Sequence, residues 1–287
     1  MSDVPTTHNP TVAVILPTHA RPHTIAYSIR SVLRQTWPHL ELHVVGDGCD
    51  EATAEVVRSF DDPRVIFHPF PKAPGYGYAN RNLVLRSLRS DYVTHASDDD
   101  LWFPDHLEHA MTALDGGRLD YIVTRSVHVR SSGELDPHFF AFDWRLPLVS
   151  GFLHNWFVGA TNVVLRRAVL DTIGYWNEAL MRFGDRELYE RCRTARLAGE
   201  YRNHPTILRF YAQDWDHLYK GLAEPPQARF FELLGDPAWC SFVRSQAAPG
   251  RRSLAARRRQ WLDMLRFTRV SGPKFVRFQI ERWRKPC

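Results

Sequence analysis

Short β-favouring runs alternate with helical patterns along the first hundred residues. Four runs predict strands, at residues 11–16, 40–45, 65–67 and 92–95. The first run, TVAVIL, has no polar alternation, which is typical of a parallel strand buried on both faces. Strands separated by helices of about 10 to 15 residues indicate right-handed βαβ units. The chain is therefore predicted to have an α/β fold with a mostly parallel central sheet flanked by helices.

Three consecutive carboxylates, Asp98, Asp99 and Asp100, lie between the fourth predicted strand and a helix that begins near Pro104. In an open α/β sheet, ligands bind at the carboxyl ends of the strands. Carboxylate oxygens suit Mg²⁺ or Mn²⁺, and these cations also bind substrate phosphates. The run therefore predicts a metal and ligand site, and a solvated acidic turn is the alternative.

Charge is unevenly distributed along the 287 residues. The net charge is +5, but residues 250–287 contain twelve Lys or Arg and two Asp or Glu, so the rest of the chain has a net charge of −5. Leu254, Trp261, Leu262 and Leu265 share one helical face of this segment, which indicates a basic helical extension. Such a helix is typical of a membrane-surface element, and a helix packed on the domain is the alternative. No nucleic-acid-binding motif accompanies the charge.

Composition is that of a soluble globular protein, with 44% apolar and 24% charged residues. No apolar run approaches the roughly 18 to 20 residues of a membrane-spanning helix, and residues 1–10 lack the pattern of a secretory signal. The four cysteines are scattered without a Cys-x-x-Cys pair. These features predict a cytoplasmic protein, and the basic extension favours a peripheral position at the inner face of the membrane.

Four separated segments together resemble one known family. They are residues 14–18 (VILPT), 44–48 (VVGDG), 75–82 (GYGYANRN) and 97–104 (SDDDLWFP). In this order and spacing they resemble the nucleotide-sugar-binding half of the inverting family 2 glycosyltransferases, which have the GT-A fold. The resemblance is strong over residues 12–114 and looser over residues 159–193.

The resemblance implies nucleotide-binding roles for the first three segments. Pro17 and Thr18 match the segment that contacts the nucleotide, and Asp47 matches the aspartate that hydrogen-bonds the base. Taken alone, Asp47 is a turn residue before a glycine. Arg81 falls in the first turn of a helix, where free N–H groups and the helix dipole favour phosphate and a guanidinium adds donors. Taken alone, Arg81 is a surface charge.

The fourth segment matches the metal-binding motif of the family, which usually reads Asp-x-Asp-Asp before Leu-Trp-x-Pro. Ser97 occupies the first acidic position here, which is a departure from the family. Asp99 matches the metal-binding aspartate. Asp98 is the candidate for the ribose or metal contact, because Ser97 has no carboxylate to make it. Asp100 is expected to support the loop. The implied cofactor is Mg²⁺ or Mn²⁺.

An inverting transfer also needs a base that removes the proton of the acceptor hydroxyl. In the family this base is the Asp of a Glu-Asp pair that opens a helix. Here Asp185 occupies that place, and Gly184 replaces the Glu. Asp185 is therefore the implied base, with a helix N-cap as its alternative role. The family often has an Arg and a His in a later strand, where this chain has Tyr211 and Gln213.

The predicted function is the inverting transfer of a sugar from a nucleoside diphosphate sugar, most often UDP-linked, to a hydroxyl of a saccharide, lipid-linked or other acceptor. A metal-dependent nucleotidyltransferase or pyrophosphatase and a non-catalytic nucleotide-binding protein of the same fold are the alternatives. The predicted GT-A domain covers residues 1–235, with a nucleotide-binding half at about 11–115 and an acceptor and catalytic half at about 116–235. The basic helical extension covers residues 236–287.

Overall fold

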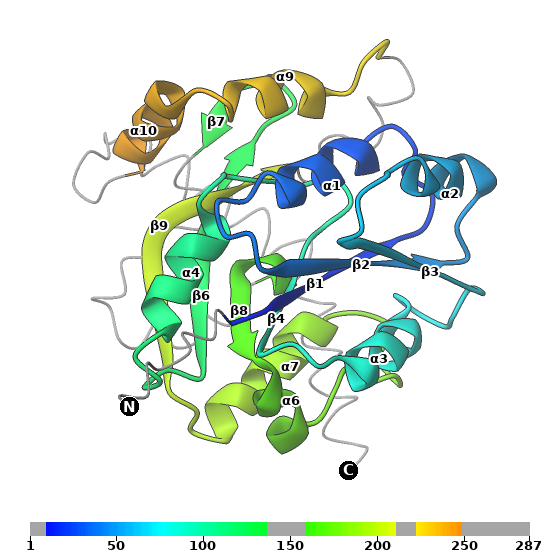
Figure 1. Ribbon diagram of the computed structural model, residues 1–287, viewed down its shortest axis with the longest axis vertical. Helices are drawn as coiled ribbons and strands as arrows, with labels where there is room; N and C mark the ends of the chain where they lie inside the picture. The colour runs from blue at the N-terminus through cyan, green and yellow to red at the C-terminus, as the bar shows by residue number, and fades with distance from the viewer. Residues whose placement is uncertain (1–9, 137–158, 211–221, 248–287) are drawn as a thin grey trace, which may run out of the picture.

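The computed structural model describes residues 10–136, 159–210 and 222–247 (Figure 1). Strands and helices alternate over the first part of the chain. The elements of this part are β1 (Val12–Thr18), α1 (Ile25–Leu33), β2 (Leu40–Asp47), α2 (Glu51–Arg58), β3 (Val65–Phe70), α3 (Tyr78–Ser87) and β4 (Tyr92–His95). The four strands predicted here are confirmed.

The second part of the chain adds strands and helices in a less regular order. Its elements are β5 (Leu101–Trp102), α4 (His106–Leu114), β6 (Tyr121–Val129), β7 (Leu135–Asp136), the 3₁₀ helix η1 (Ala160–Asn162), β8 (Val163–Arg166), α6 (Arg167–Ile173), α7 (Gly184–Thr194), β9 (Gly199–Phe210), α9 (Pro226–Leu233) and α10 (Pro237–Gln246). The long strand β9 curves along one side of the molecule (Figure 1).

One sheet contains all the strands of the described residues, in the order β3-β2-β1-β4-β8-β6-β9-β5, with β7 paired to β6 outside this order. The strand β1 is parallel to β2 and β4, and β2 is parallel to β3. The strand β8 is antiparallel to both β4 and β6, whereas β6 and β9 are parallel. The predicted parallel arrangement is therefore confirmed for the first four strands. The complete sheet is mixed, because β8, β5 and β7 are each antiparallel to the strands with which they pair.

The register brings the ends of β1, β2 and β4 to one edge of the sheet. Thr18, the last residue of β1, is paired with Gly46, next to the end of β2. Ile15 of β1 is paired with His95, the last residue of β4. The residues that follow these strands therefore meet at the edge where open α/β sheets bind ligands.

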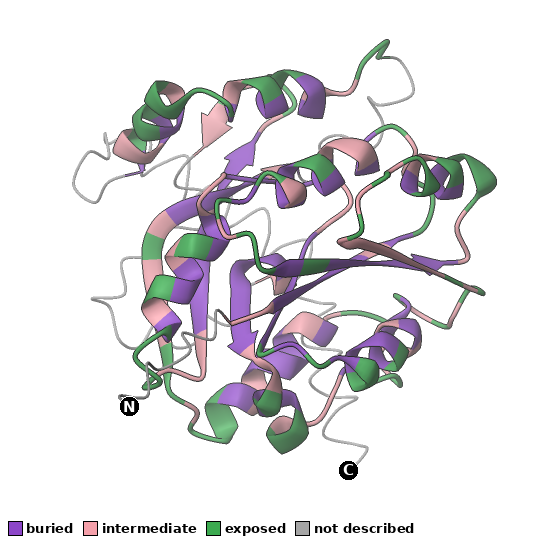
Figure 2. Cartoon of the chain, viewed as in Figure 1, coloured by how far each residue is buried: buried purple, intermediate pink, exposed green. Residues whose placement is uncertain are grey.

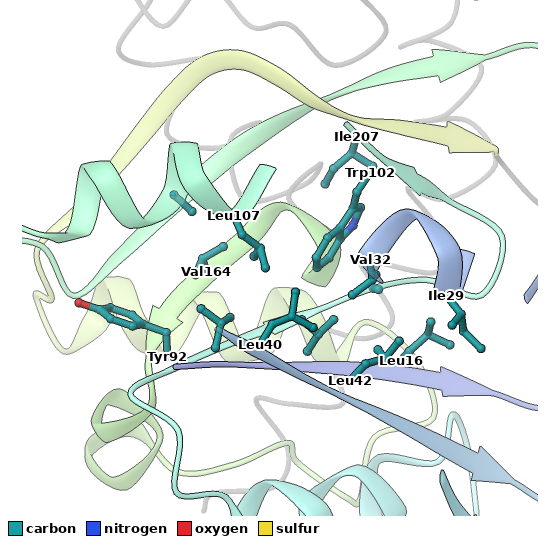
Figure 3. Packing of buried hydrophobic residues seen from close by; sticks show 14 of the residues in the cluster. Leu16, Ile29, Val32, Leu40, Leu42, Tyr92, Trp102, Leu107, Val164 and Ile207 are labelled. Atoms are coloured by element: carbon teal, nitrogen blue, oxygen red, sulfur yellow. The ribbon is translucent and has the colours of Figure 1, made fainter. Parts of the chain in front are cut away.

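Each face of the parallel strands has its own apolar core, because side chains alternate between the faces. Leu16 and Leu42 pack with Ile29 and Leu107 on the face covered by α1, α2 and α4 (Figure 3). Ile15 belongs to the opposite core, which α3, α6 and α7 cover (Figure 1). Burial on both faces explains why the first predicted strand has no polar alternation (Figure 2).

A third core joins β5, β6 and β9 to the helices α9 and α10, and includes Phe210 and Phe230. Residues 248–287, which contain most of the predicted basic extension, lie outside the described residues. The division predicted at residue 235 stays a prediction. Within the described ranges, no helix has the length and apolar character needed to cross a membrane.

Candidate active site

The residues predicted to bind the nucleotide lie at the edge of the sheet where β1, β2 and β4 end. Pro17 and Thr18 are the last residues of β1, and Asp47 is the last residue of β2. Thr18 and Asp47 are both buried. Asp98 lies just beyond β4, with its Oδ1 atom 4.0 Å from Arg21 Nε. The structure thus brings together the first, second and fourth predicted segments.

Hydrogen bonds to backbone carbonyls hold the acidic loop in place. The Asp98 carbonyl accepts from Thr24 Oγ1 at 2.8 Å, and the Asp100 carbonyl accepts from Ser28 Oγ at 2.9 Å. The carbonyl of the residue between them accepts from Gln227 Nε2 on α9 at 2.9 Å. The loop is therefore fixed through its backbone by the start of α1 and by α9.

Asp100 differs from the other two aspartates because its carboxylate binds the end of β9. Oδ1 accepts from the Phe210 N–H at 3.0 Å, and Oδ2 lies 3.4 Å from Arg209 Nε. The residue is only 4% exposed. The prediction that Asp100 supports the loop is confirmed, and the alternative of a solvated acidic turn is wrong because this carboxylate is buried and paired.

Asp98 and Asp99 carry the remaining negative charge of the loop. Burial raises the pKa of both carboxyls, and the charges of Asp100 and Asp98 raise the pKa of Asp99 further. A bound cation would offset this repulsion. Across the described ranges, no group of three or more His, Cys, Asp or Glu side chains could hold a metal ion. Mg²⁺ is commonly held by one or two carboxylates together with substrate phosphates, so the aspartate pair fits a metal whose coordination a bound diphosphate completes.

Asp47 organises the loop between β3 and α3. Its Oδ1 accepts from the Ala73 N–H and from Asn80 Nδ2, both at 2.8 Å, and its Oδ2 accepts from Lys72 Nζ. Gly77 has a φ of +69°, and a Cβ there would lie 2.6 Å from Asp47 Oδ2, so both conformation and space require glycine. The base contact of Asp47 stays a prediction, and Lys72 is a neighbouring cation that the sequence patterns did not indicate.

The Arg81 guanidinium lies over two aromatic rings, with Cζ 5.0 Å from the ring centre of Tyr78 and 5.4 Å from that of Trp176. Nη2 donates to the Tyr76 carbonyl at 2.7 Å, and Nε is buried with no hydrogen-bond partner in the part of the chain that the structure describes. Burial lowers the pKa of Arg81. The surface-charge alternative is therefore wrong, and a half-buried guanidinium with a buried Nε that has no partner among the described residues is suited to an anion such as phosphate.

Asp185 lies in the first turn of α7. The N-cap of this helix is Phe183, in the left-handed region with a φ of 62°, so the N-cap alternative for Asp185 is wrong. The Asp185 Oδ1 accepts from the Arg186 N–H at 2.9 Å. Burial raises the pKa of Asp185, while the charges of Arg186, Arg209 and Arg81 lower it. Because these arginines come from α7, β9 and α3, Asp185 shares an electrostatic environment with the other predicted residues.

Arg209 on β9 is a candidate site residue that the sequence interpretation missed. Its Nη2 donates to Thr161 Oγ1 and, at 3.1 Å, to Asn162 Oδ1. Burial raises the pKa of Asp99 and of Asp185, and the charge of Arg209 opposes both shifts. The charge of Arg209 therefore acts on both the acidic loop and the predicted base.

The signal that could have found Arg209 was its position between Leu208 and Phe210. A charged residue inside an apolar strand is seldom buried unless it is paired, so such a position indicates specific partners. The positions expected to carry the family's later Arg and His, Tyr211 and Gln213, lie outside the described residues.

A comparison with known families agrees with this geometry. The model of glycosyl transferase family 2 matches residues 13–174. The chain belongs to glycosyl transferase family 2. The matched range contains Asp47, Arg81 and Asp99 but ends before Asp185 and Arg209, so the family match by itself does not assign these last two residues.

Curated relatives of this family 2 chain are named as glycosyltransferases. An uncharacterized glycosyltransferase of Rickettsia typhi is 23% identical over 219 residues, which are 72% of this chain and 66% of that protein. The Escherichia coli UDP-Glc:alpha-D-GlcNAc-diphosphoundecaprenol beta-1,3-glucosyltransferase WfgD is 26% identical over 164 residues, which are 57% of this chain and 63% of WfgD. The chain thus spans less than two thirds of the length of these relatives.

Solved structures confirm the GT-A fold. TarS 1-349 of S. aureus in complex with UDP has a TM-score of 0.56 at 17% identity, over 83% of this chain and 70% of that chain. The mannosyltransferase PcManGT of Pyrobaculum calidifontis, in complex with GDP-Man and Mn²⁺, has a TM-score of 0.56 at 17% identity, over 91% of this chain and 81% of that chain. At this level of identity the likeness concerns the fold alone.

Proposed function

We propose that this protein transfers a sugar from a nucleoside diphosphate sugar to a hydroxyl acceptor, with inversion at the anomeric carbon. The observation that carries the proposal is the environment of Arg81. Burial lowers its pKa, and the charges of Asp185, Asp47 and Asp98 raise it, so all three carboxylates act electrostatically on this one cation. A cation between a base-binding, a metal-binding and a proton-accepting carboxylate is suited to stabilise a diphosphate leaving group.

The donor nucleotide binds at the ends of β1 and β2 in this proposal. Pro17 and Thr18 contact the nucleoside, and Asp47 accepts an N–H from the base. The hydrogen bonds that hold Asp47 support this role, because a buried carboxylate with a fixed geometry can select a donor of matching geometry. Arg81 donates to the diphosphate.

Asp98 and Asp99 would hold Mg²⁺ or Mn²⁺, and the ion supplies positive charge that stabilises the departing diphosphate when it is bound. The hydrogen bonds of the acidic loop support this assignment. Asp100 and the backbone carbonyls of the loop bind neighbouring elements, and the hydrogen bond of Asp99 with α9 uses its carbonyl rather than its carboxylate.

Asp185 accepts the proton of the acceptor hydroxyl as the hydroxyl oxygen attacks the anomeric carbon. The new glycosidic bond forms on the face opposite the diphosphate, and the bond between the sugar and the diphosphate breaks. Burial raises the pKa of Asp185, which makes the carboxylate a stronger base than an exposed aspartate, while the charges of Arg186, Arg209 and Arg81 favour its ionised form.

We infer a UDP-sugar as the donor and a saccharide or lipid-linked hydroxyl as the acceptor. The printed name of WfgD gives UDP-Glc as its donor and a GlcNAc-diphosphoundecaprenol as its acceptor, and the TarS neighbour was solved with UDP. A carboxylate such as Asp47 suits the N–H of uracil, because that base presents a donor between two carbonyl groups.

A peripheral position at the inner face of the membrane is also part of this proposal. It rests on residues 250–287, whose net charge of +10 favours anionic lipid at about 1 kcal/mol for each basic residue near the surface. Sedimentation with vesicles of phosphatidylglycerol and phosphatidylcholine tests it. Retention that is equal on neutral and anionic vesicles would contradict the proposal.

The deciding experiment is product analysis with UDP-Glc, UDP-GlcNAc and GDP-Man in the presence of Mn²⁺. Release of the free nucleoside diphosphate supports transfer of the sugar to an acceptor or to water. Pyrophosphate or a nucleoside monophosphate would instead indicate a nucleotidyltransferase or pyrophosphatase. Nucleotide binding without turnover of any donor would indicate a non-catalytic protein of this fold.

A further inference from the structure

Tyr78, the first residue of α3, fills the space beside Gly184, the first residue of α7. The Gly184 N–H donates to Tyr78 Oη at 3.0 Å. A Cβ at position 184 would lie 2.5 Å from Tyr78 Cζ and 2.8 Å from Tyr78 Oη, which is closer than non-bonded carbon and oxygen atoms approach. A side chain at position 184 and the Tyr78 ring therefore exclude each other.

The Tyr78 hydroxyl accepts a hydrogen bond from a backbone N–H at the start of α7, which has no partner within that helix. The first N–H groups of a helix have no partner within the helix, and a Ser, Thr, Asp or Asn at the N-cap usually accepts from one of them. The N-cap of α7 is Phe183, which makes no side-chain capping hydrogen bond. Tyr78 thus caps α7 from a different helix, directly before Asp185.

The same ring supports the anion-binding side of the site. Tyr78 is 5% exposed and stacks on Trp176, with ring centres 5.3 Å apart and an interplanar angle of 12°. Arg81 lies over both rings. Burial raises the pKa of Tyr78 to about 12, so its hydroxyl stays protonated at neutral pH. One neutral side chain therefore contacts the guanidinium and the start of α7.

We propose that Tyr78 is a positioning residue, which caps α7 through Gly184 and so sets Asp185 relative to Arg81. The proposal rests on the function proposed above, in which Arg81 binds the diphosphate and Asp185 accepts the proton. It also accounts for the departure at Gly184. Here a tyrosine from α3 occupies the space of a side chain before the base, and only glycine leaves room for it.

Tyr78→Phe tests the hydroxyl, because it keeps the ring and removes the acceptor of the Gly184 N–H. We expect kcat to fall by about tenfold or more, since small misplacements of a reacting group have large effects on rate. The KM for the donor and the affinity for UDP with Mn²⁺ stay within about twofold, because Arg81 still lies over the ring. Tyr175→Phe is the matched control, since it removes a hydroxyl that donates to Asp171 at 3.0 Å on the surface, and leaves kcat unchanged.

An unchanged kcat in Tyr78→Phe would overturn the proposal, because simple ring packing survives this substitution. A rise in donor KM at constant kcat would overturn it as well, since Tyr78 would then act on donor binding. If the wild-type protein turns over none of UDP-Glc, UDP-GlcNAc and GDP-Man, the result contradicts the proposed function. Turnover by the wild type, together with an unchanged kcat in Tyr78→Phe, contradicts only the positioning role of Tyr78.

A second measurement tests the pair without using activity. Gly184→Ala is made in the wild type and in Tyr78→Leu, which retains the inner part of the side chain and vacates the outer ring atoms. We expect Gly184→Ala to lower Tm clearly in the wild type and by less than half as much in the Tyr78→Leu background. Equal losses of Tm in the two backgrounds would show that positions 78 and 184 do not exclude each other, and would overturn the proposal.

Discussion

The Asp100 carboxylate accepts the backbone N–H of Phe210 at 3.0 Å and joins the acidic loop to the last residue of β9. Its second oxygen lies 3.4 Å from Arg209 Nε. The three adjacent aspartates therefore differ in their contacts, because the Asp98 carboxylate lies near Arg21 and that of Asp100 binds the end of β9. Asp100 joins the loop to β9, and ligand binding by Asp98 and Asp99 stays a proposal.

Replacing Asp100 should destabilise the protein far more than replacing Asp99. Asp100→Ala leaves Arg209 without its carboxylate and the Phe210 N–H without its acceptor, and breaking a buried pair in this way costs about 3–5 kcal/mol. Asp99→Ala should cost less than about 1 kcal/mol, because the Asp99 carbonyl keeps its bond to Gln227 and charge repulsion falls. Urea unfolding at equal m-values measures both changes in the free energy of unfolding. Similar losses of stability in the two variants would contradict a structural role that belongs to Asp100 and not to Asp99.

Nucleotide binding should depend on the metal and on Asp99. UDP with Mn²⁺ should raise Tm of the wild type, since saturation at about 100 times Kd stabilises a protein by about 2.7 kcal/mol. EDTA should remove most of the effect, and Asp99→Asn should abolish its metal-dependent part. The measurement is thermal unfolding with UDP, Mn²⁺ or both. A full UDP and Mn²⁺ shift in Asp99→Asn would exclude Asp99 as a metal ligand.

Asp185→Asn should remove turnover and keep donor binding. Loss of a general base lowers kcat by about 10²–10⁴-fold, and an amide of nearly the same shape leaves the site intact. The matched control is Asp171→Asn on the surface of α6, which should keep wild-type kcat. Steady-state kinetics and UDP binding by calorimetry check both variants, and appreciable turnover in Asp185→Asn rules out Asp185 as the base.

The rate should fall on the acid side as Asp185 becomes protonated. Burial raises the pKa of Asp185, so the acid limb of the kcat profile should lie at higher pH than for an exposed aspartate. The base works only when ionised, so activity is present above this pKa and is lost as pH falls through it. The charges of Arg186, Arg209 and Arg81 oppose the shift, so Arg186→Gln should move the limb to still higher pH. A pH–rate profile measured at saturating donor checks this, and a limb that moves to lower pH contradicts it.

Arg81→Lys should weaken donor binding although it keeps the positive charge. An ammonium group cannot present a planar fork of donors or stack on Tyr78 and Trp176 as a guanidinium does. We expect donor KM to rise about tenfold or more, the effect of losing one charge-assisted hydrogen bond of roughly 1.5–3 kcal/mol. Arg86→Lys, on the exposed side of the same helix, is the control and should leave KM unchanged. Equal KM values in the two variants would argue against a diphosphate at Arg81.

Much of the fold and part of the site could be predicted from local patterns. The apolar run of β1 predicts a strand buried on both faces, and Asp47 and Asp98 lie at or just beyond the ends of strands that meet at one edge. The sequence could not indicate the contact of Tyr78 with Gly184, because the two residues are 106 positions apart. No local periodicity contains information about such a pair.

The sequence by itself determined the alternation of strands and helices, the family and the positions of the candidate carboxylates, because these follow from short-range patterns and motifs. Only the tertiary structure decided that Asp100 is structural, that Arg81 lies against aromatic rings, and that α7 is capped by a tyrosine of α3. The physical reason is that burial, charge environment and hydrogen-bond partners are set by which distant segments pack together. A carboxylate in the printed sequence therefore acquires its role only when its neighbours in space are known.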